Sequence, residues 1–374
     1  MHRLVHFAED GDTSGFFPAL AKYHSRQKFE MTFATLKPMA PWLEAFMHER
    51  KVETFACGAR GRLQYPLSLL GLIRHLRTSR CEIFHAHLFD PSVVGLTAAR
   101  LVGTRARILT RHYSNYHTRI NRPLHVELDR WCTLSAHRVI AVSNETADHL
   151  IRVEGAPVSK VTAIHNGIDF ERVRVSGPDA GSNLRRELDL GETFTFLVAG
   201  RLHPEKGYEP LFQAVQRLKA RATRPFVVLA AGRGPFLNRY QEQVASLGLG
   251  NQVRFLGFRS DLADLMVASN VFVLPSVAES FGLVLAEALY LGRPVLATRV
   301  GGIPEIVDDG RDGLLVPPGD PLALSHAMES FLRGEVELPG QGKAAIEKVR
   351  ARFSFEEMMR KYEAVYDHVL GEDR

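Results

Sequence analysis

Two series of short β-prone runs, each alternating with stretches of helical spacing, most constrain the fold of this 374-residue chain. The first series comprises residues 3–8, 31–36, 52–57, 82–87, 105–110, 138–143 and 161–167. The second comprises residues 194–200, 226–232, 253–258, 271–276, 294–299 and 313–318. Strands that alternate with helices typically form parallel sheets with helices on both faces. The sequence therefore predicts an α/β protein with two open sheets, divided by the polar stretch 169–192, and ligand binding at the carboxyl ends of the strands.

The composition narrows the classes of protein to consider. With 45% hydrophobic and 24% charged residues, the chain is typical of globular proteins. No apolar run approaches the ~18 residues that a membrane-spanning helix requires. The first residues, MHRLVHFAEDG, become acidic too early for a secretory signal. The three cysteines, Cys57, Cys81 and Cys132, form neither a disulfide framework nor a zinc spacing, which favours a cytoplasmic protein.

The net charge of +5 is unevenly distributed. Residues 1–169 contain 22 lysines and arginines against 15 acidic residues, and the surplus is concentrated between Arg50 and Arg80. The predicted helix 66–79 places four apolar residues at helical spacing on one stripe, which are Leu69, Leu72, Ile73 and Leu76. Arg74 and Arg77 fall off that stripe. This basic face predicts either an ordinary solvated surface or peripheral contact with an anionic membrane.

The stretch ESFGLVLAE (279–287) places two carboxylates around a Phe-Gly step. It joins a predicted strand to a predicted helix, so we expect Glu279 in the loop and Glu287 one to two turns inside the helix. The first N–H groups of a helix have no helical partner and carry the positive end of its dipole. The stretch therefore predicts a site for a phosphate that has hydroxyl groups on either side.

Two glycine-containing loops follow strands of the second series. GRLHPEKG begins at Gly200 and contains Arg201 and Lys206, the residue types that usually bind a pyrophosphate. AGRGPF contains Gly232, but Leu237 stands where a dinucleotide-binding fingerprint has its third glycine. The second loop thus argues against a dinucleotide dehydrogenase, and each loop alone also fits an ordinary surface turn.

Taken together, ESFGLVLAE, GRLHPEKG, HNGID (165–169) and GGIPEIVDDGRDGLLVPPGDP (301–321) resemble the retaining nucleotide-sugar glycosyltransferases of family 4. The resemblance implies the GT-B fold, with two facing Rossmann-like domains and a cleft between them. It implies an acceptor-binding domain over 1–170 and a donor-binding domain over 171–354. The C-terminal helix, 355–374, is then expected to pack back on the first domain.

The resemblance also implies roles for the residues of ESFGLVLAE. Glu279 contacts the hydroxyl groups of the donor sugar, and Glu287 holds the ribose hydroxyls. The backbone of Phe281, Gly282 and Leu283 lies against the sugar and the pyrophosphate.

Other donor-binding residues follow from the same resemblance. Arg201 and Lys206 match the pair that binds the pyrophosphate, and Gly200 and Gly232 lie in the loops around it. Arg259 falls where members of the family approach the nucleotide base. We predict catalytic roles for Arg201 and Lys206, and for Glu279 and His87 with them.

In the first half, His87 of IFHAHLFDP matches a family histidine beside the transferred sugar, where it can bond a hydroxyl and a developing positive charge. We expect His85 to point to the opposite face of the strand and to be structural. Gly15 in DGDTSGFF matches the second glycine of a Gly-Gly loop near the phosphates. The sequence departs from the family here, because Ser14 replaces the first glycine and Phe16 and Phe17 follow Gly15.

Two other signals are interpreted conservatively. Asp10-Gly11-Asp12 has the DxD spacing that chelates a metal in another glycosyltransferase fold, but here loop acidity is the better interpretation, and no metal is expected. Residues 111–125 mix histidine, tyrosine and arginine as nucleic-acid-binding patches do. No RNA- or DNA-binding motif accompanies them, so we predict an acceptor-cleft loop and no nucleic acid.

The sequence thus predicts a cytoplasmic retaining glycosyltransferase, without a cofactor other than its nucleotide-sugar co-substrate. It would transfer a sugar from a UDP- or GDP-sugar to a hydroxyl acceptor, such as a glycan or a lipid-linked glycan of the cell envelope. Two alternatives remain open. One is a GT-B nucleotide-sugar epimerase, which the two glutamates and GRLHPEKG disfavour. The other is a non-catalytic relative that binds the donor or partner proteins. The altered loop at Gly15 favours it, whereas the presence of Arg201, Lys206, Glu279 and Glu287 counts against it.

Overall fold

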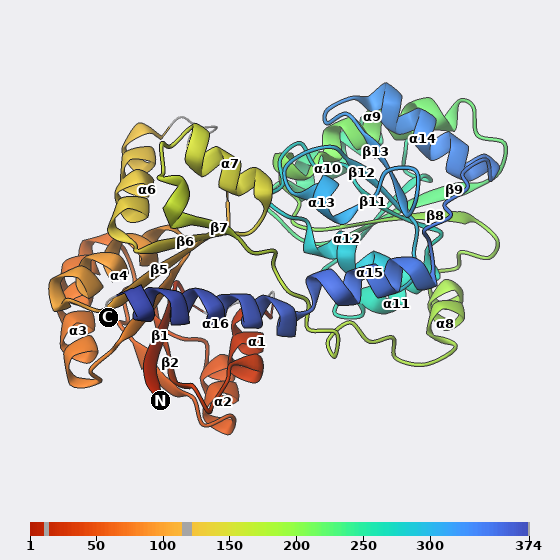
Figure 1. Ribbon diagram of the computed structural model, residues 1–374. Helices are drawn as coiled ribbons and strands as arrows, with labels where there is room; N and C mark the ends of the chain where they lie inside the picture. The colour runs from red at the N-terminus through yellow and green to blue at the C-terminus, as the bar shows by residue number, and fades with distance from the viewer. Residues whose placement is uncertain (11–14, 114–121, 373–374) are drawn as a thin grey trace. The chain divides into compact units, whose positions relative to one another are not determined.

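The computed structural model describes residues 1–10, 15–113 and 122–372. It divides into two units, each with its own parallel sheet (Figure 1). The first unit contains Met1–Gly167 together with the C-terminal segment that starts at Phe355, and the second contains Ile168–Ser354. The predicted α/β class with two parallel sheets is confirmed.

The first unit has, within the described residues, a sheet of seven parallel strands in the order β3-β2-β1-β4-β5-β6-β7. These strands are β1 (His2–Ala8), β2 (Phe29–Thr35), β3 (Glu53–Ala56), β4 (Ile83–His87), β5 (Ala106–Arg111), β6 (Arg138–Ala141) and β7 (Val161–Ala163). The helices are α1 (Phe16–Tyr23), α2 (Pro41–Glu49), α3 (Tyr65–Thr78), α4 (Phe89–Val102), α6 (Pro123–Ser135), α7 (Asn144–Arg152) and α16 (Phe355–Glu372). Short 3-10 turns lie at η1 (Arg62–Gln64) and η2 (Val158–Lys160).

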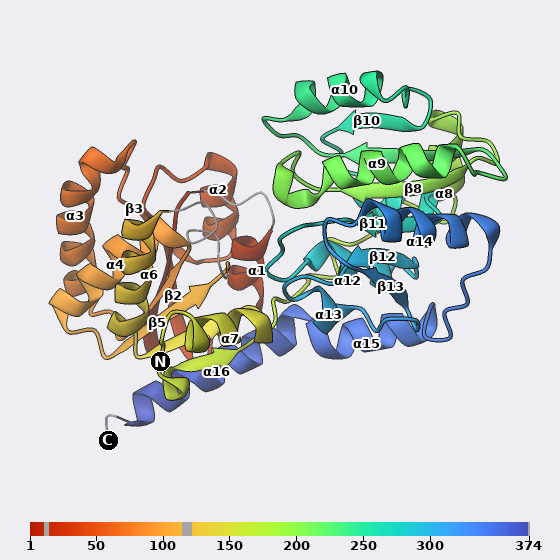
Figure 2. The same cartoon turned by 90° about the horizontal axis from the view of Figure 1, so that it is seen from above.

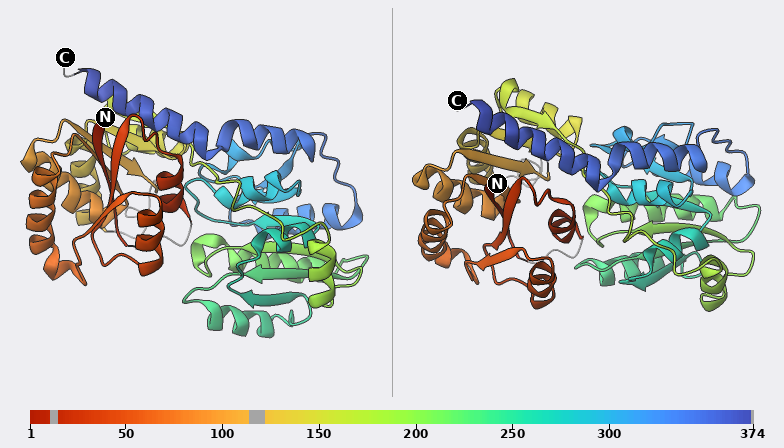
Figure 3. Two further views of the ribbon diagram at one scale, coloured as in Figure 1. Left: turned by 90° about the horizontal axis from the view of Figure 1, so that it is seen from below. Right: turned by 60° about the horizontal axis from the view of Figure 1, so that its bottom comes forward.

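Helices cover both faces of this sheet, which explains why successive residues of its central strands are buried rather than alternately buried and exposed. One face packs on α1, α2 and α16, and its core includes Leu20, Met47 and Tyr362. The other packs on α3, α4, α6 and α7, and its core includes Leu72 and Leu150. The C-terminal helix α16 lies along the first face (Figure 3). It therefore belongs to the first unit, although the whole second unit precedes it in sequence.

The second unit has, again counting described residues, six parallel strands in the order β10-β9-β8-β11-β12-β13. They are β8 (Phe194–Ala199), β9 (Phe226–Ala231), β10 (Val253–Gly257), β11 (Val271–Leu274), β12 (Val295–Thr298) and β13 (Gly313–Val316). The helices are α8 (Ala180–Glu187), α9 (Tyr208–Lys219), α10 (Leu237–Ser246), α11 (Leu262–Ala268), α12 (Leu283–Tyr290), α13 (Ile303–Ile306), α14 (Pro321–Arg333) and α15 (Lys343–Phe353). A 3-10 turn, η3 (Pro204–Lys206), precedes α9.

The helices α9 and α14 lie side by side on one face of this second sheet (Figure 2). Their inward residues, such as Leu211, Val215 and Met328, join the strand side chains in one core. The order of the strands places β8 and β11 in the middle of the sheet as direct neighbours. The loops that follow these two central strands carry the predicted donor-binding motifs. Across the described residues, no helix combines the length and the apolar character that crossing a membrane requires.

Candidate active site

Two neighbouring loops of the second unit position a lysine and a glutamate together. Because β8 and β11 are parallel and adjacent, the loops after them leave the same edge of the sheet. Lys206, the last residue of η3, places its Nζ 2.5 Å from Oε2 of Glu279. The N–H of Val277 donates to the carbonyl of Glu205 at 2.8 Å, which ties the two loops to each other. The structure thus brings Lys206 and Glu279 into direct contact across 73 residues of sequence.

The first turn of α12 follows Glu279 directly. Gly282 precedes the helix with φ +96°, a left-handed conformation that favours glycine, and no side chain caps this helix end. The side chain of Phe281 is 3% exposed and packs edge-on against Phe353, with ring centroids 5.7 Å apart. Leu283 then begins the helix. The buried Phe281 anchors a turn whose uncapped N–H groups and positive dipole end favour an anionic ligand.

The loops after β8 and β9 approach each other closely at two glycines. A Cβ atom on Gly232 would lie 1.9 Å from the carbonyl oxygen of Gly200, so no larger residue fits at position 232. A Cβ on Gly200 would lie 3.9 Å from the side chain of Lys206. Arg201, in the same loop, has a 60% exposed side chain whose guanidinium is 3.5 Å from Glu205. Arg201 is therefore close to Lys206 in sequence, but its guanidinium pairs with Glu205 and not with Glu279.

Glu287 lies on α12 with a partly buried side chain. Its carboxyl group makes no hydrogen bond or ion pair with the described residues. Burial raises the pKa of Glu287 to about 7, although the positive charge of Arg172 acts in the opposite direction. A desolvated carboxyl without partners is able to accept hydrogen bonds from the hydroxyl groups of a ligand.

The loop after β10 contains Arg259 and an exposed aromatic side chain that the sequence analysis missed. The guanidinium of Arg259 contacts Asp261 at 2.5 Å and Glu187 at 3.3 Å, and hydrogen bonding to Asp261 raises the pKa of Arg259. Phe258 is 61% exposed, and the guanidinium of Arg233 lies 4.5 Å from its ring centroid. The sequence feature that could have identified Phe258 is its position as the last, apolar residue of the predicted strand 253–258.

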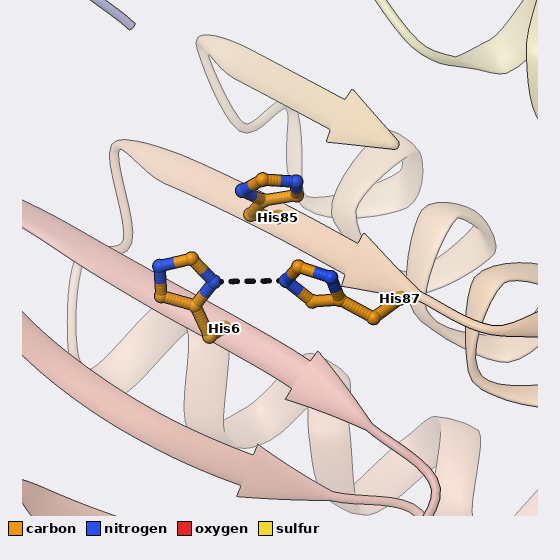
Figure 4. Close-up of side chains that lie close together, drawn as sticks. All are labelled: His6, His85 and His87. Atoms are coloured by element: carbon orange, nitrogen blue, oxygen red, sulfur yellow. Dashed lines mark hydrogen bonds between the residues drawn. The ribbon is translucent and has the colours of Figure 1, made fainter. Parts of the chain in front are cut away.

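Four histidines lie together at the ends of β1, β4 and β5 in the first unit. The side chains of His6, His85 and His87 lie close together (Figure 4), and all three are fully buried. Nε2 of His87 is 3.0 Å from Nδ1 of His6, and Nδ1 of His87 is 3.2 Å from Nε2 of His112. The rings of His85 and His87 stack with centroids 4.3 Å apart. The expectation that His85 faces away from His87 was wrong, because residues two apart on a strand point to the same face.

Neighbouring hydroxyl groups hold His85 at both ring nitrogens. Its Nδ1 is 2.6 Å from the hydroxyl of Tyr366 on α16, and its Nε2 is 2.7 Å from that of Thr110. Burial, reinforced by the neighbouring imidazoles, lowers the pKa of His85 and of His87 well below the usual value. Burial also lowers the pKa of His6 to about 3. All three rings are therefore neutral at physiological pH.

These three imidazoles are the group within the described residues whose nitrogens lie close enough, within 4.8 Å of one another, to suggest a metal site. Their hydrogen bonds argue for another arrangement. Both nitrogens of His85 already face hydroxyl groups, and the nearest nitrogens of His6 and His87 face each other. The cluster is thus a hydrogen-bonded network rather than a preformed set of metal ligands.

Phe16 and Phe17, the first residues of α1, pack over the same cluster. Gly15 is the N-cap residue of α1, and Phe16 and Phe17 pack edge-on against His87 with ring centroids 5.8 and 5.5 Å away. These aromatic rings contribute to the complete burial of His87. Asp12, Ser14 and residues 114–121 of the predicted acceptor loop lie outside the described residues.

Backbone strain marks the position after His87. Leu88 has φ +67° and ψ 172°, which a leucine rarely adopts. Such a conformation costs about 1–3 kcal/mol and persists only where the surroundings hold it, commonly at functional sites. The hydroxyl of Ser92 donates to the carbonyl of Leu88 and helps to hold this turn. The strain makes the end of β4 a candidate functional position.

Family models match both halves of the chain. Residues 19–172 match the model described as Glycosyltransferase Family 4, and residues 182–349 match Glycosyl transferases group 1. A D-inositol 3-phosphate glycosyltransferase of Streptomyces avermitilis is 36% identical over 222 residues, which cover 56% of this chain and 47% of the relative. The match thus spans about half of that relative's length. The N-acetyl-alpha-D-glucosaminyl L-malate synthase of Bacillus anthracis is 28% identical over 340 residues, covering 88% of this chain and 85% of that enzyme.

Solved structures share the fold over the whole chain. HepE of Anabaena, crystallised with UDP and glucose, has a TM-score of 0.83 at 21% identity and covers 98% of this chain and 100% of its own. A sucrose-phosphate synthase of Thermosynechococcus elongatus has a TM-score of 0.80 at 20% identity and full coverage of both chains. At these identities the structures establish the fold.

Proposed function

This chain belongs to the family 4 glycosyltransferases of GT-B fold, and we propose that it transfers a sugar from a nucleotide diphosphate sugar to a hydroxyl acceptor with retention of anomeric configuration. The proposal rests above all on the contact between Lys206 and Glu279 beside the uncapped first turn of α12. A sugar diphosphate requires a cation and a helix N-terminus to bind its phosphates. It also requires a group, such as a carboxylate, that accepts hydrogen bonds from its sugar hydroxyls.

Charge stabilisation explains how this site would promote the reaction. When the bond between sugar and diphosphate breaks, negative charge accumulates on the departing phosphate. Lys206, Arg201 and the N–H groups at Gly282 and Leu283 would stabilise that charge without a metal ion. The acceptor hydroxyl would attack from the face that the phosphate leaves, and the phosphate would take its proton. Glu279 would orient the sugar by accepting hydrogen bonds from its hydroxyl groups.

Two further positions of the second unit support a nucleotide. The unpartnered carboxyl of Glu287 is suited to the two hydroxyl groups of a ribose. Phe258 offers an exposed aromatic face beside Arg233 and Arg259, to which a nucleotide base can stack. We propose UDP or GDP as the nucleotide, and HepE, crystallised with UDP-glucose, makes UDP the first to test.

In the first unit, we propose that the end of β4 contacts the transferred sugar. The position of His87 at the carboxyl end of β4 and the strained backbone of Leu88 support this assignment. Phe16 and Phe17 bury the side chain of His87, so these rings would have to move for a sugar to reach it. The acceptor is proposed to be a glycan or a lipid-linked glycan of the cell envelope.

The surface of α3 supports an acceptor at an anionic membrane. The predicted inward stripe is confirmed for Leu72 and Leu76, which are fully buried. On the outside, Leu67 (72%) and Leu70 (64%) of α3 are exposed, as is Leu63 (99%) of the preceding η1. They are accompanied by exposed arginines at positions 60, 62, 74, 77 and 80. Leucines flanked by arginines suit a helix that lies in the interface of an anionic bilayer.

A panel of nucleotide sugars tests the proposed function against its two alternatives. A glycosyltransferase releases the nucleoside diphosphate and forms a new glycoside. An epimerase of the same fold would change the sugar configuration without forming a glycoside on an acceptor. A non-catalytic relative would bind a donor and return it unchanged. Separation of the nucleotides and sugars after incubation distinguishes the three outcomes, and either of the last two overturns the proposal.

A further inference from the structure

His87 lies between two other imidazoles in a chain that crosses three neighbouring strands. β1, β4 and β5 are adjacent in the sheet, and His6 on β1 pairs in register with His85 on β4. Nδ1 of His6 faces Nε2 of His87 at 3.0 Å (Figure 4), and Nδ1 of His87 faces Nε2 of His112 at 3.2 Å. Both contacts are within hydrogen-bond distance.

The neutral state of the buried rings limits how protons are arranged along this chain. A neutral imidazole has one N–H donor and one acceptor nitrogen. If His6 donates to Nε2 of His87, then His87 carries its proton on Nδ1 and donates to His112. In the opposite arrangement, His87 donates to His6, and the proton of His6 must then lie on its Nε2.

The buried Nε2 of His6 decides between the two directions. This atom is buried and has no hydrogen-bond partner. The opposite arrangement would leave an N–H group there without an acceptor, and orphaned buried N–H groups are rare in folded proteins. If His6 donates to His87 instead, Nε2 of His6 carries a lone pair without a partner, and no N–H group is orphaned. The direction from His6 to His87 to His112 is therefore favoured.

We propose that His6 is a positioning residue for His87: its Nδ1–H donates to Nε2 of His87 and keeps the proton of His87 on Nδ1. This inference rests on the proposed contact of His87 with the transferred sugar. With its proton on Nδ1, His87 donates to Nε2 of His112. A sugar hydroxyl that contacts His87 would take the place of His112 as the acceptor of this hydrogen bond. Tyr366 and Thr110 fix the ring of His85, which stacks on His87 and so supports the orientation of that ring.

Nitrogen NMR of the histidine rings in the full-length protein tests the proton position directly. In the wild-type protein, Nδ1 of His87 is expected to give the signal of a protonated nitrogen and Nε2 that of a bare one. The opposite pattern would overturn the proposal. This measurement needs no variant beyond one that assigns the His87 signals.

Two variants of His6 connect the proton position to activity. His6→Leu removes the donor, so we expect a mixed signal at His87 and a kcat about tenfold lower at unchanged KM for the donor. His6→Asn keeps a donor near the position of Nδ1, so it should restore both the signal and most of kcat. His24→Asn, at the buried histidine that follows the last residue of α1 and bonds the carbonyl of Ala21 instead, is the matched control.

The outcomes separate this inference from the function on which it rests. A His87 signal that stays on Nδ1 in His6→Leu would overturn the positioning role of His6, whatever the activity. A signal that changes while kcat stays constant would instead contradict the proposed contact of His87 with the sugar. If His6→Leu does not fold, the wild-type spectrum and His6→Asn still decide the question.

Discussion

The ammonium group of Lys206 lies 2.5 Å from the carboxylate of Glu279, and both side chains are largely shielded, with 23% and 14% of their surfaces exposed. In the proposed mechanism the two side chains bind different parts of the donor. Lys206 contacts the phosphate and Glu279 the sugar. A phosphate that binds there must compete with Glu279 for the ammonium group.

Substitutions at the two positions should therefore affect the affinity for free nucleoside diphosphate differently. Lys206→Ala should weaken this affinity and cut turnover by about 100-fold, because it removes a stabilising charge and leaves Glu279 unpaired near the phosphate. Glu279→Ala should lower turnover comparably yet leave the affinity equal or higher. Calorimetry with UDP and GDP measures the contrast, with Lys343→Ala, at a 91% exposed lysine, as the control. If Lys206→Ala and Glu279→Ala weakened the affinity for nucleoside diphosphate equally, the assignment of Lys206 to the phosphate and of Glu279 to the sugar would be wrong.

Glu287→Gln should stabilise the protein at high pH while it weakens nucleotide binding. The pKa of Glu287 is raised from 4.5 to about 7, so the folded state favours the protonated carboxyl. This contribution to stability is present below pH 4.5 and is lost as the pH rises to about 7. The glutamine should therefore add about 1–3 kcal/mol to the free energy of unfolding at pH 8, allowing for partial exposure, and little at pH 4.5.

Urea unfolding at the two pH values measures this stability difference, and Glu242→Gln, at an exposed glutamate of α10, is the matched control. The same Glu287→Gln variant should bind nucleoside diphosphate about 1–3 kcal/mol more weakly, because an amide accepts hydrogen bonds less strongly than a carboxylate. A gain in stability without a loss of affinity would exclude Glu287 from the ribose site.

Phe258→Ala should weaken the binding of nucleoside diphosphates by about 1–3 kcal/mol, the range found for bases stacked on aromatic rings. Inorganic pyrophosphate, which lacks a base, should bind the variant as well as it binds the wild-type protein. Leu322→Ala, at a 48% exposed leucine of α14, is the control. An equal loss for pyrophosphate would mean that Phe258 supports the loop and not the base.

The outer surface of α3 should bind anionic membranes. Co-sedimentation with phosphatidylserine vesicles should decrease with salt, since charge attraction is screened. It should also decrease in Arg74→Gln/Arg77→Gln, by up to about 1 kcal/mol per arginine. Leu67→Gln/Leu70→Gln should lose binding as well. The matched control, Leu101→Gln/Leu124→Gln, changes two leucines that are 61% and 68% exposed on α4 and α6. Wild-type protein that stays in the supernatant at low salt would exclude this surface as a membrane site.

The sequence was sufficient for the fold because parallel sheets covered on both faces require continuous apolar strands. All the predicted β-prone runs became strands, whose ends differ from the predicted ends by at most four residues. The inward face of α3 was also predictable from helical spacing, since Leu72 and Leu76 must face the sheet to be buried.

The contacts of the candidate site were less predictable, because they depend on the order of the strands in space. Lys206 meets Glu279 only because β11 pairs with β8, while β9 and β10 lie on the other side. His6 reaches His87 because β1 and β4 are neighbours. Neither strand order is encoded in local spacing. The exposure of Phe258 also depends on where the sheet ends, which no periodicity indicates.

Nucleoside diphosphate release in the presence of EDTA tests the central claim most directly. We expect the wild-type protein to release UDP or GDP from at least one UDP- or GDP-sugar, with slow transfer to water when no acceptor is supplied. Arg201→Ala/Lys206→Ala should release it at least about 100-fold more slowly, because charge on the departing diphosphate is then unstabilised. Release that depends on added manganese, or that is as fast in the double variant as in the wild-type protein, would contradict this account.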